Sequence, residues 1–101
     1  MAGKQHEAIS VGQRVCVLSH RDRVGTVRFV GPTAFGPGEW LGIEFDVCFQ
    51  EKIEGCHDGC EGGHRYFTCK KGRGVYMRLQ GSRLLKVYQV MGVEVCNSKL
   101  I

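Results

Sequence analysis

Proline is scarce in this chain, with 2 residues in 101, and no apolar run approaches the roughly 18 residues that a membrane-spanning helix needs. These absences argue against a proline-rich linker and against a transmembrane helix. Residues 1–10 are polar and lack the apolar stretch of a secretory signal, so we expect a cytoplasmic protein. The formal net charge of +4 is compatible with an acidic partner but too slight to favour nucleic acid.

Helical periodicity is also missing. A helix needs about ten residues of 3.6-residue apolar pattern, and glycine interrupts nearly every candidate segment. The 15 glycines are about twice the usual share and favour turns and bulges. The apolar pattern predicts strands at 11–17, 26–30, 40–45, 65–69, 74–78 and 84–95, the last as one strand or as two around Gly92.

Turn-forming residues separate these strands. Gly31-Pro32 is predicted to end the second strand, 36–38 and 58–63 to be loops, and 47–54 to be either a loop or a short helical turn. A chain of this length holds one domain. We therefore predict an all-β fold, a small, glycine-rich, highly twisted antiparallel sheet or open barrel.

Two glycine-rich motifs carry most of the functional information. The first is Thr33-x-Phe35-Gly36-Pro37-Gly38-x-Trp40-x-Gly42-x-x-x-Asp46, and the second is Gly55-Cys56-His57-Asp58-Gly59, followed by Tyr66-Phe67-x-Cys69. Together they resemble the CAP-Gly domain, a glycine-rich module of microtubule-associated proteins. The resemblance covers residues 11–87, with 1–10 expected as a flexible segment and 88–101 as a further strand or extension.

The resemblance implies a Src-homology-3-like β module that binds and does not catalyse. Its expected ligands are acidic C-terminal tails ending in an aromatic residue, of the Glu-Glu-Tyr or Glu-Glu-Phe type, on α-tubulin or on end-binding proteins. It also implies a cytoskeletal, microtubule-associated location. Transport, plus-end tracking and tubulin folding all remain open as the wider role.

The resemblance places Phe35, Trp40 and Tyr76 along a hydrophobic groove for the terminal aromatic residue of the tail. Aromatic residues of a small protein are usually part of its core. A ring beside a glycine-rich loop, however, keeps one face uncovered, which is typical of a peptide-recognition surface. Many family members have Phe at the position of Tyr76, so we expect an additional hydroxyl at the rim of the groove.

The pentapeptide of residues 55–59 departs from the family form, Gly-Lys-Asn-Asp-Gly, at two positions. Gly55 and Gly59 permit a tight turn whose backbone N–H groups favour carboxylates. Cys56 replaces the Lys of the family and His57 replaces the Asn, whereas Asp58 matches. A His at this second position is similar to the tubulin-folding cofactor type. We expect a weaker and more pH-sensitive grip on acidic tails than the family norm.

Arg78 lies where the family has a basic residue beside the groove. Its guanidinium is expected to supply part of the missing charge by bidentate carboxylate recognition, although a solvated strand residue is an equal alternative. The absent Lys removes a contact of about 1.5–3 kcal/mol. An alternative function is therefore a degenerate CAP-Gly scaffold with weak tail binding.

The six cysteines raise the alternative of a small zinc-binding β domain. Cys56, Cys60, His64 and Cys69 lie within fourteen residues, at spacings that zinc sites use. No Cys-x-x-Cys pair is present, so we expect no cofactor and reduced thiols. A Cys56–His57 dyad is a poor catalyst, because neighbours in sequence rarely face each other productively, and we expect no enzyme.

A nucleic-acid interface is a further alternative. A basic turn lies close in sequence to three aromatic residues, a combination that binds single strands on small β-barrels. These residues are Lys70, Lys71 and Arg73, with Tyr66, Phe67 and Tyr76. A basic turn on a solvated face is the commoner arrangement, so nucleic acid is not expected as a partner.

Overall fold

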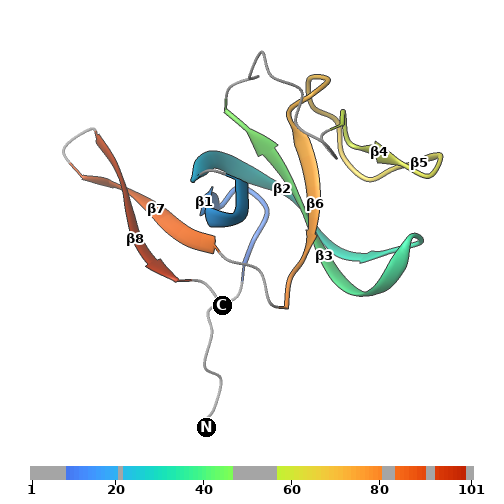
Figure 1. Cartoon of the computed structure of the whole chain (residues 1–101), viewed down its shortest axis with the longest axis horizontal. Coiled ribbons are helices and arrows are strands. Elements are labelled where there is room, and N and C mark those ends of the chain that lie inside the picture. The colour runs from blue at the N-terminus through green and yellow to red at the C-terminus, as the bar shows by residue number, and fades with distance from the viewer. Residues whose placement is uncertain (1–8, 21, 47–56, 81–83, 91–92, 100–101) are drawn as a thin grey trace, which may run out of the picture.

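The computed structural model describes residues 9–20, 22–46, 57–80, 84–90 and 93–99 (Figure 1). Its main sheet is antiparallel and six-stranded, in the order β6-β3-β2-β1-β7-β8. The strands are β1 (Arg14–Val17), β2 (Arg23–Thr33), β3 (Gly36–Phe45), β6 (Gly74–Arg78), β7 (Leu84–Val90) and β8 (Val93–Lys99). A second, two-stranded sheet pairs β4 (Cys60–Glu61) with β5 (His64–Arg65). The predicted all-β fold is confirmed.

Helical structure within the described residues is limited to one 3-10 turn, Leu18–His20. Within the same residues, no helix is long and apolar enough to cross a membrane. The twisted β2–β3 pair makes the longest hairpin, and the β7–β8 hairpin projects from the opposite side of the molecule in Figure 1.

Alternation along β3 divides its residues between two faces of the sheet. Leu41, Ile43 and Phe45 are 0%, 0% and 1% exposed and form the centre of the hydrophobic core. Side chains of a strand point alternately to opposite faces, so the even-numbered residues from Trp40 to Glu44 lie on the other face. The core therefore fixes which residues of β3 are available for binding.

The prediction that Gly31-Pro32 ends the second strand is wrong. β2 continues to Thr33, and Pro32 lies opposite Glu39 in the register. β1 pairs only with the first part of β2, between Arg23 and Thr26, so the missing N–H of Pro32 leaves no ladder bond unmade on that side.

The loop predicted at 36–38 is also wrong, because β3 begins at Gly36, which pairs with Thr33. Only Ala34 and Phe35 form the turn between the two strands. Phe35 is therefore held at the tip of a hairpin.

Two predictions on the segment after the pentapeptide need correction. Residues 58–63 are not all loop, because β4 and β5 form a hairpin around Gly62 and Gly63, whose φ angles of 59° and 85° suit a two-residue turn. The strand predicted at 65–69 ends at Arg65. Tyr66 and Phe67 instead lay their rings against the sheet, where they contact Phe29 and Tyr76.

The remaining strand predictions vary in outcome. The first strand begins at Arg14 rather than at 11, because residues 10–13 form a turn closed by the Gln13 N–H and the Ser10 carbonyl at 3.0 Å. Ile9 already packs in the core, at 9% exposure. The strands expected at 40–45 and 74–78 are confirmed, as are two strands around Gly92. Residues 47–54 lie outside the described residues.

The core makes a first prediction. Leu41→Ala should lower the free energy of unfolding by about 2–5 kcal/mol, because the removed methyl groups leave a cavity in a fully buried site. Urea denaturation followed by circular dichroism measures the change. Val11→Ala, at a residue 61% exposed, is the matched control and should alter the value by less than about 0.5 kcal/mol. Equal effects of the two substitutions would contradict this core.

Candidate functional site

The face of the sheet opposite the core carries the candidate site. Tyr76 of β6 lies directly opposite Gly42 of β3, and Arg78 lies directly opposite Trp40. Directly paired residues of an antiparallel sheet project to the same face. Strand register thus brings Trp40, Tyr76 and Arg78 together, as the sequence predicts.

Four half-buried aromatic residues form a continuous cluster on this face: Phe35, Trp40, Tyr66 and Tyr76. The ring of Phe35 contacts the other three, with centroids 4.9 Å from Trp40, 5.7 Å from Tyr66 and 5.0 Å from Tyr76. None of the four is sealed in the core. Tilted and edge-on contacts of this kind hold aromatic rings in fixed orientations while leaving part of each ring accessible.

The indole of Trp40 is positioned by its own strand. It packs on Gly36, where a Cβ atom would lie 2.8 Å from Cζ2 of the ring. Its Nε1–H donates to the carbonyl of Pro37 at 3.2 Å. On the ring, the guanidinium carbon of Arg78 lies 5.4 Å from the centroid, a cation–π distance. Gly36 and Pro37 therefore orient the indole, and the guanidinium of Arg78 lies beside it.

Tyr66 belongs to the cluster although sequence reasoning did not place it there. Its hydroxyl accepts a hydrogen bond from the Ala34 N–H at 2.8 Å and ties the segment after β5 to the β2–β3 turn. The sequence shows Tyr66 beside Phe67, and we interpreted this aromatic pair as part of a strand. Phe67 is 9% exposed and packs on Gly42, so it supports the cluster from below.

The hydroxyl of Tyr76 does not stand free at the rim, which corrects our expectation. It donates to the carbonyl of Gly59 at 2.7 Å. Burial raises the pKa of Tyr76 to about 12, so the phenol stays protonated at neutral pH. The ring also stacks on the imidazole of His57, with centroids 4.6 Å apart and planes inclined by 24°. The pentapeptide is thereby joined to the aromatic cluster.

His57 is fixed in one tautomer by its hydrogen bond. Its Nδ1 accepts from the Gly59 N–H at 2.8 Å, so the neutral ring carries its proton on Nε2. That Nε2 is buried and has no hydrogen-bond partner among the described residues. Burial lowers the pKa of His57 below 6.5, more than the charges of Glu61 and Asp58 raise it. The ring is therefore neutral at pH 7.

We expected backbone N–H groups of residues 55–59 to hold carboxylates, and the described N–H groups of His57 and Gly59 are instead engaged within the protein. The N–H of His57 donates to Gly74, that of Gly59 to His57, and that of Cys60 to the Asp58 carboxylate at 3.2 Å. The Cys60 N–H is the main cause of the lowered pKa of Asp58, and that of Asp58 itself adds to it. This loop is held by its own hydrogen bonds.

The side chain of Asp58 lies at the surface, and its carboxylate is engaged by neighbouring groups of the protein. Besides its bond from Cys60, the carboxylate pairs with the guanidinium of Arg65 at 3.4 Å. Arg65 also donates to the carbonyls of Asp58 and Phe67, at 3.1 and 3.3 Å. The role of Asp58 in the described structure is thus to shape the turn. Gly55 and Cys56, the other predicted members of the site, lie outside the described residues.

The described cysteines and histidines of the zinc alternative do not come together as a metal site. Within the described ranges, no three His, Cys, Asp or Glu side chains are grouped to hold a metal ion. The thiol of Cys69 lies 3.6 Å from the carbonyl of His57, and burial raises its pKa to about 11. Cys56, the remaining predicted zinc ligand, lies outside the described residues.

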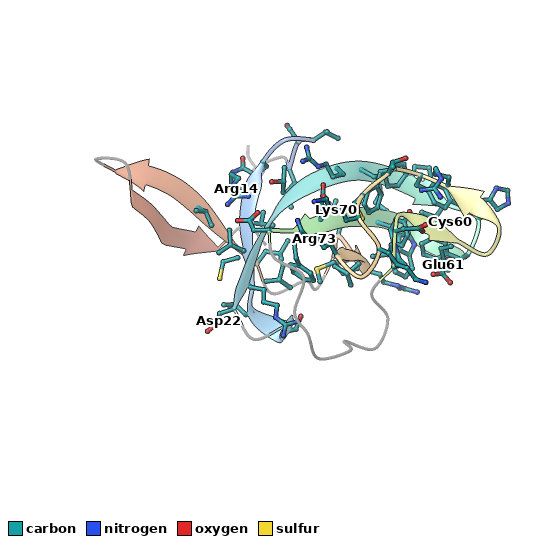
Figure 2. All side chains as sticks on the ribbon, turned by 90° about the horizontal axis from the view of Figure 1, so that it is seen from above. Arg14, Asp22, Cys60, Glu61, Lys70 and Arg73 are labelled. Atoms are coloured by element: carbon teal, nitrogen blue, oxygen red, sulfur yellow. The ribbon has the colours of Figure 1, made fainter. Side chains whose placement is uncertain are left out.

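One of the three rings that the nucleic-acid alternative would need is not available for stacking. Lys70 and Arg73 lie midway along the molecule in Figure 2, between Arg14 and the end that carries Cys60 and Glu61. Phe67 is buried against Gly42 and offers no open face for stacking a base.

Comparison with known proteins defines the class of protein. The family model of the CAP-Gly domain matches residues 11–81 of this chain. The chain belongs to the CAP-Gly family, and CAP-Gly domains are binding modules rather than enzymes.

Individual relatives agree with this assignment. The microtubule-associated protein ssm4 of Schizosaccharomyces pombe is 40% identical over 78 residues, which is 77% of this chain and 10% of ssm4. Tubulin-specific chaperone E of Danio rerio is 48% identical over 61 residues, covering 60% of this chain and 10% of the chaperone. The chain thus spans about a tenth of the length of these relatives. The solution structure of the CAP-Gly domain in human kinesin-like protein KIF13B superposes with a TM-score of 0.60, at 35% identity and 82% coverage of both chains.

The lowered pKa of His57 makes a prediction about pH. The unfolded chain takes up a proton at this residue near pH 6.5 and the folded chain only at lower pH. Stability is therefore unaffected above pH 6.5, falls as the pH drops below it, and levels off below the lowered pKa. One proton limits the slope to about 1.4 kcal/mol per pH unit.

His57→Asn provides the comparison, because Asn does not titrate and is the residue that the family form carries. Chemical denaturation at pH 7 and pH 5 should show a smaller loss in this variant than in the parent chain. An NMR titration of the imidazole should give a midpoint below 6.5. Identical pH profiles in both proteins would contradict the burial of His57.

Proposed function

We propose that this domain binds acidic C-terminal tails that end in an aromatic residue, of the kind carried by α-tubulin and end-binding proteins. The observation that carries the proposal is the half-buried aromatic cluster of Phe35, Trp40, Tyr66 and Tyr76, with a cation at its edge. The terminal ring of the tail inserts among these rings. Arg78 then meets the carboxylates that lie beside that ring.

The rigidity of the cluster supports insertion of a ring. Phe35 is held at the tip of the β2–β3 hairpin, and the Tyr66 hydroxyl fixes that tip through Ala34. Trp40 is oriented by Gly36 and Pro37. Rings that are already ordered lose little side-chain entropy on binding, so more of the contact free energy contributes to affinity.

Charge supports the choice of an acidic partner. Arg78 lies beside the face of Trp40 and offers a planar fork that matches a carboxylate in bidentate geometry. Nε2–H of His57 has no acceptor in the part of the chain that the structure describes, and a carboxylate oxygen that reached it would offset the cost of its burial. Because Cys56 stands where the family form has Lys, the carboxylate contact at the pentapeptide comes from the neutral His57. This contact is weaker than one made by a cation.

Relatives point to the same class of partner. Similar chains belong to a microtubule-associated protein and to a tubulin-specific chaperone. A contact limited to one short tail buries little area, and we expect an affinity in the micromolar range. Tighter association in a longer parent protein would come from additional domains. We place the domain in the cytoplasm, on microtubules or on their subunits.

The deciding experiment compares two peptides, one ending in Glu-Glu-Tyr and a copy that lacks the terminal Tyr. Isothermal titration calorimetry should detect the first and show a loss of at least about tenfold for the second. Trp40→Ala should weaken binding of the first peptide by more than about 1 kcal/mol, as expected of a central aromatic contact.

Tyr88→Ala is the matched control for Trp40→Ala, because it removes an aromatic residue from β7, which β2 and β1 separate from β3. Its affinity for the peptide should equal that of the parent chain. Equal binding of the two peptides, or binding of neither, would reject the proposed function. Circular dichroism of each variant establishes that a loss of binding is not a loss of fold.

Cys56 generates a separate prediction. Cys56→Lys restores the cation of the family form and should tighten binding of the Glu-Glu-Tyr peptide about tenfold or more, the equivalent of one charge-assisted contact of about 1.5–3 kcal/mol. Cys56→Ser removes the thiol without adding charge and should leave the affinity unchanged. No gain with Lys would mean that position 56 does not contact the tail.

A further inference from the structure

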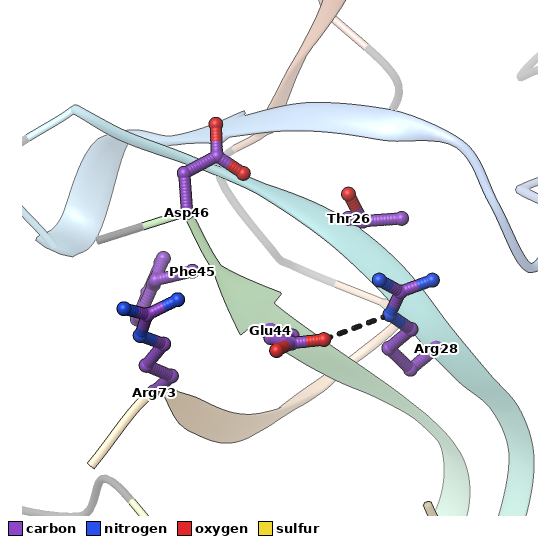
Figure 3. A pocket seen from close by; sticks show the side chains of 6 residues that line it. All are labelled: Thr26, Arg28, Glu44, Phe45, Asp46 and Arg73. Atoms are coloured by element: carbon purple, nitrogen blue, oxygen red, sulfur yellow. Dashed lines mark hydrogen bonds and ion pairs between the residues drawn. The ribbon is translucent and has the colours of Figure 1, made fainter. Parts of the chain in front are cut away.

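A hollow lies on the same side of the sheet as the aromatic cluster, farther along β3. It is lined by Thr26, Arg28, Glu44, Phe45, Asp46 and Arg73 (Figure 3). Thr26 lies directly opposite Glu44 in the β2–β3 register. Trp40 and Glu44 are four residues apart on one strand, so their side chains project to the same face. The cluster and the hollow therefore lie on the same face of the sheet, on either side of Gly42, which Phe67 covers.

The acidic residues of the hollow are already paired. The carboxylate of Asp46 accepts two hydrogen bonds from Arg14, at 2.6 and 2.5 Å, and these bonds are the main cause of its lowered pKa. Glu44 accepts from Nε of Arg28 at 3.0 Å, the contact drawn in Figure 3. Both carboxylates are therefore neutralised by arginines, Arg14 of β1 and Arg28 of β2.

Arg73 is the remaining arginine of the hollow, and its charge helps to lower the pKa of Asp46. Its Nε is buried and has no hydrogen-bond partner among the described residues. A buried donor without an acceptor costs free energy that a bound anion would restore. The backbone of Arg73 is engaged independently, through its N–H to Lys70 at 3.1 Å and its carbonyl to Phe45 at 2.8 Å. The guanidinium is thus not needed for the turn.

Charge also determines in which direction the acidic residues before the terminal ring of a bound tail extend from the aromatic cluster. A different hollow borders the cluster on the side of the β2–β3 turn, lined by Ala34, Phe35, Glu61, Gly62 and His64. It contains the carboxylate of Glu61 and neither Lys nor Arg, so it repels an acidic chain. The direction toward Arg73 offers a cation, and the Arg73 N–H donates to the carbonyl of Lys70, a second basic residue of the same turn, at 3.1 Å.

We propose that the hollow at Arg73 is a second carboxylate site, which receives an acidic side chain about four residues before the terminal aromatic residue of the same tail. The inference rests on the proposed function and adds a subsite to it. Trp40 and Glu44 are four positions apart on β3, a distance of about 13 Å at about 3.3 Å per residue. An extended peptide covers that distance in a similar number of residues.

The experiment is a double-mutant cycle between the peptide and the domain. The peptides end in Glu-Glu-Tyr, have glycine at the preceding positions, and carry either one Glu or one Gln four residues before the Tyr. With the parent domain, the Glu peptide should bind about threefold to tenfold tighter. With Arg73→Gln, the two peptides should bind equally, because the partner of the Glu is gone.

Lys99→Gln is the matched control, since it removes one positive charge from β8, at the far edge of the sheet from β6 and β3. It should preserve the difference between the Glu and Gln peptides. The subsite is overturned if Arg73→Gln still binds the Glu peptide more tightly than the Gln peptide. It is also overturned if Lys99→Gln abolishes this difference in affinity as Arg73→Gln does. Neither result affects the proposed function.

A position scan on the parent domain needs no variant and tests the geometry separately. The single Glu is moved from the third to the eighth residue before the Tyr, and the gain should peak near the fourth. A gain that does not depend on position would show non-specific attraction and overturn the subsite. Failure of the proposed function looks different, because the terminal Tyr would then make no difference to any peptide, and the subsite would fall with it.

Discussion

The site depends on the absence of side chains at three glycines, where a second layer of the chain packs against the sheet. A Cβ atom at Gly42 would overlap the ring of Phe67, and one at Gly59 would overlap the backbone carbonyl of the same residue. At Gly74, a Cβ would lie 2.8 Å from the carbonyl of His57 and 2.9 Å from Sγ of Cys69. Only glycine allows residues 57–69 to lie flat on the strands.

This close packing explains why the aromatic residues remain partly accessible in so small a domain. The core fills the opposite face of the sheet with aliphatic side chains and Phe45. The rings on the binding face are supported from below by Phe67 and held laterally by the hydroxyls of Tyr66 and Tyr76. A ring that is anchored by a hydrogen bond at its polar end can expose its apolar part without losing its orientation.

Prediction from sequence succeeded where local patterns carry the information. The apolar patterns at 40–45 and 74–78 predicted the two strands, and the family resemblance placed Trp40, Tyr76 and Arg78 at one site, where the register of these strands brings them together. It failed at Pro32 and Gly36, because local breaker signals were stronger than the evidence for pairing, and the pairing depends on a partner strand. It also missed Tyr66, whose contacts with Phe35 and Ala34 span 31 and 32 residues of sequence.

The sequence by itself determined the family, the all-β class and the identity of the aromatic residues, because these follow from motifs and from alternation along single strands. Only the tertiary structure decided which polar groups are available for a ligand. It engages the N–H groups of His57, Gly59 and Cys60 and the Asp58 carboxylate within the protein, and among the described residues it gives no acceptor to Nε2 of His57 or to Nε of Arg73. Hydrogen bonding is settled by neighbours in space, which no pattern along the chain specifies.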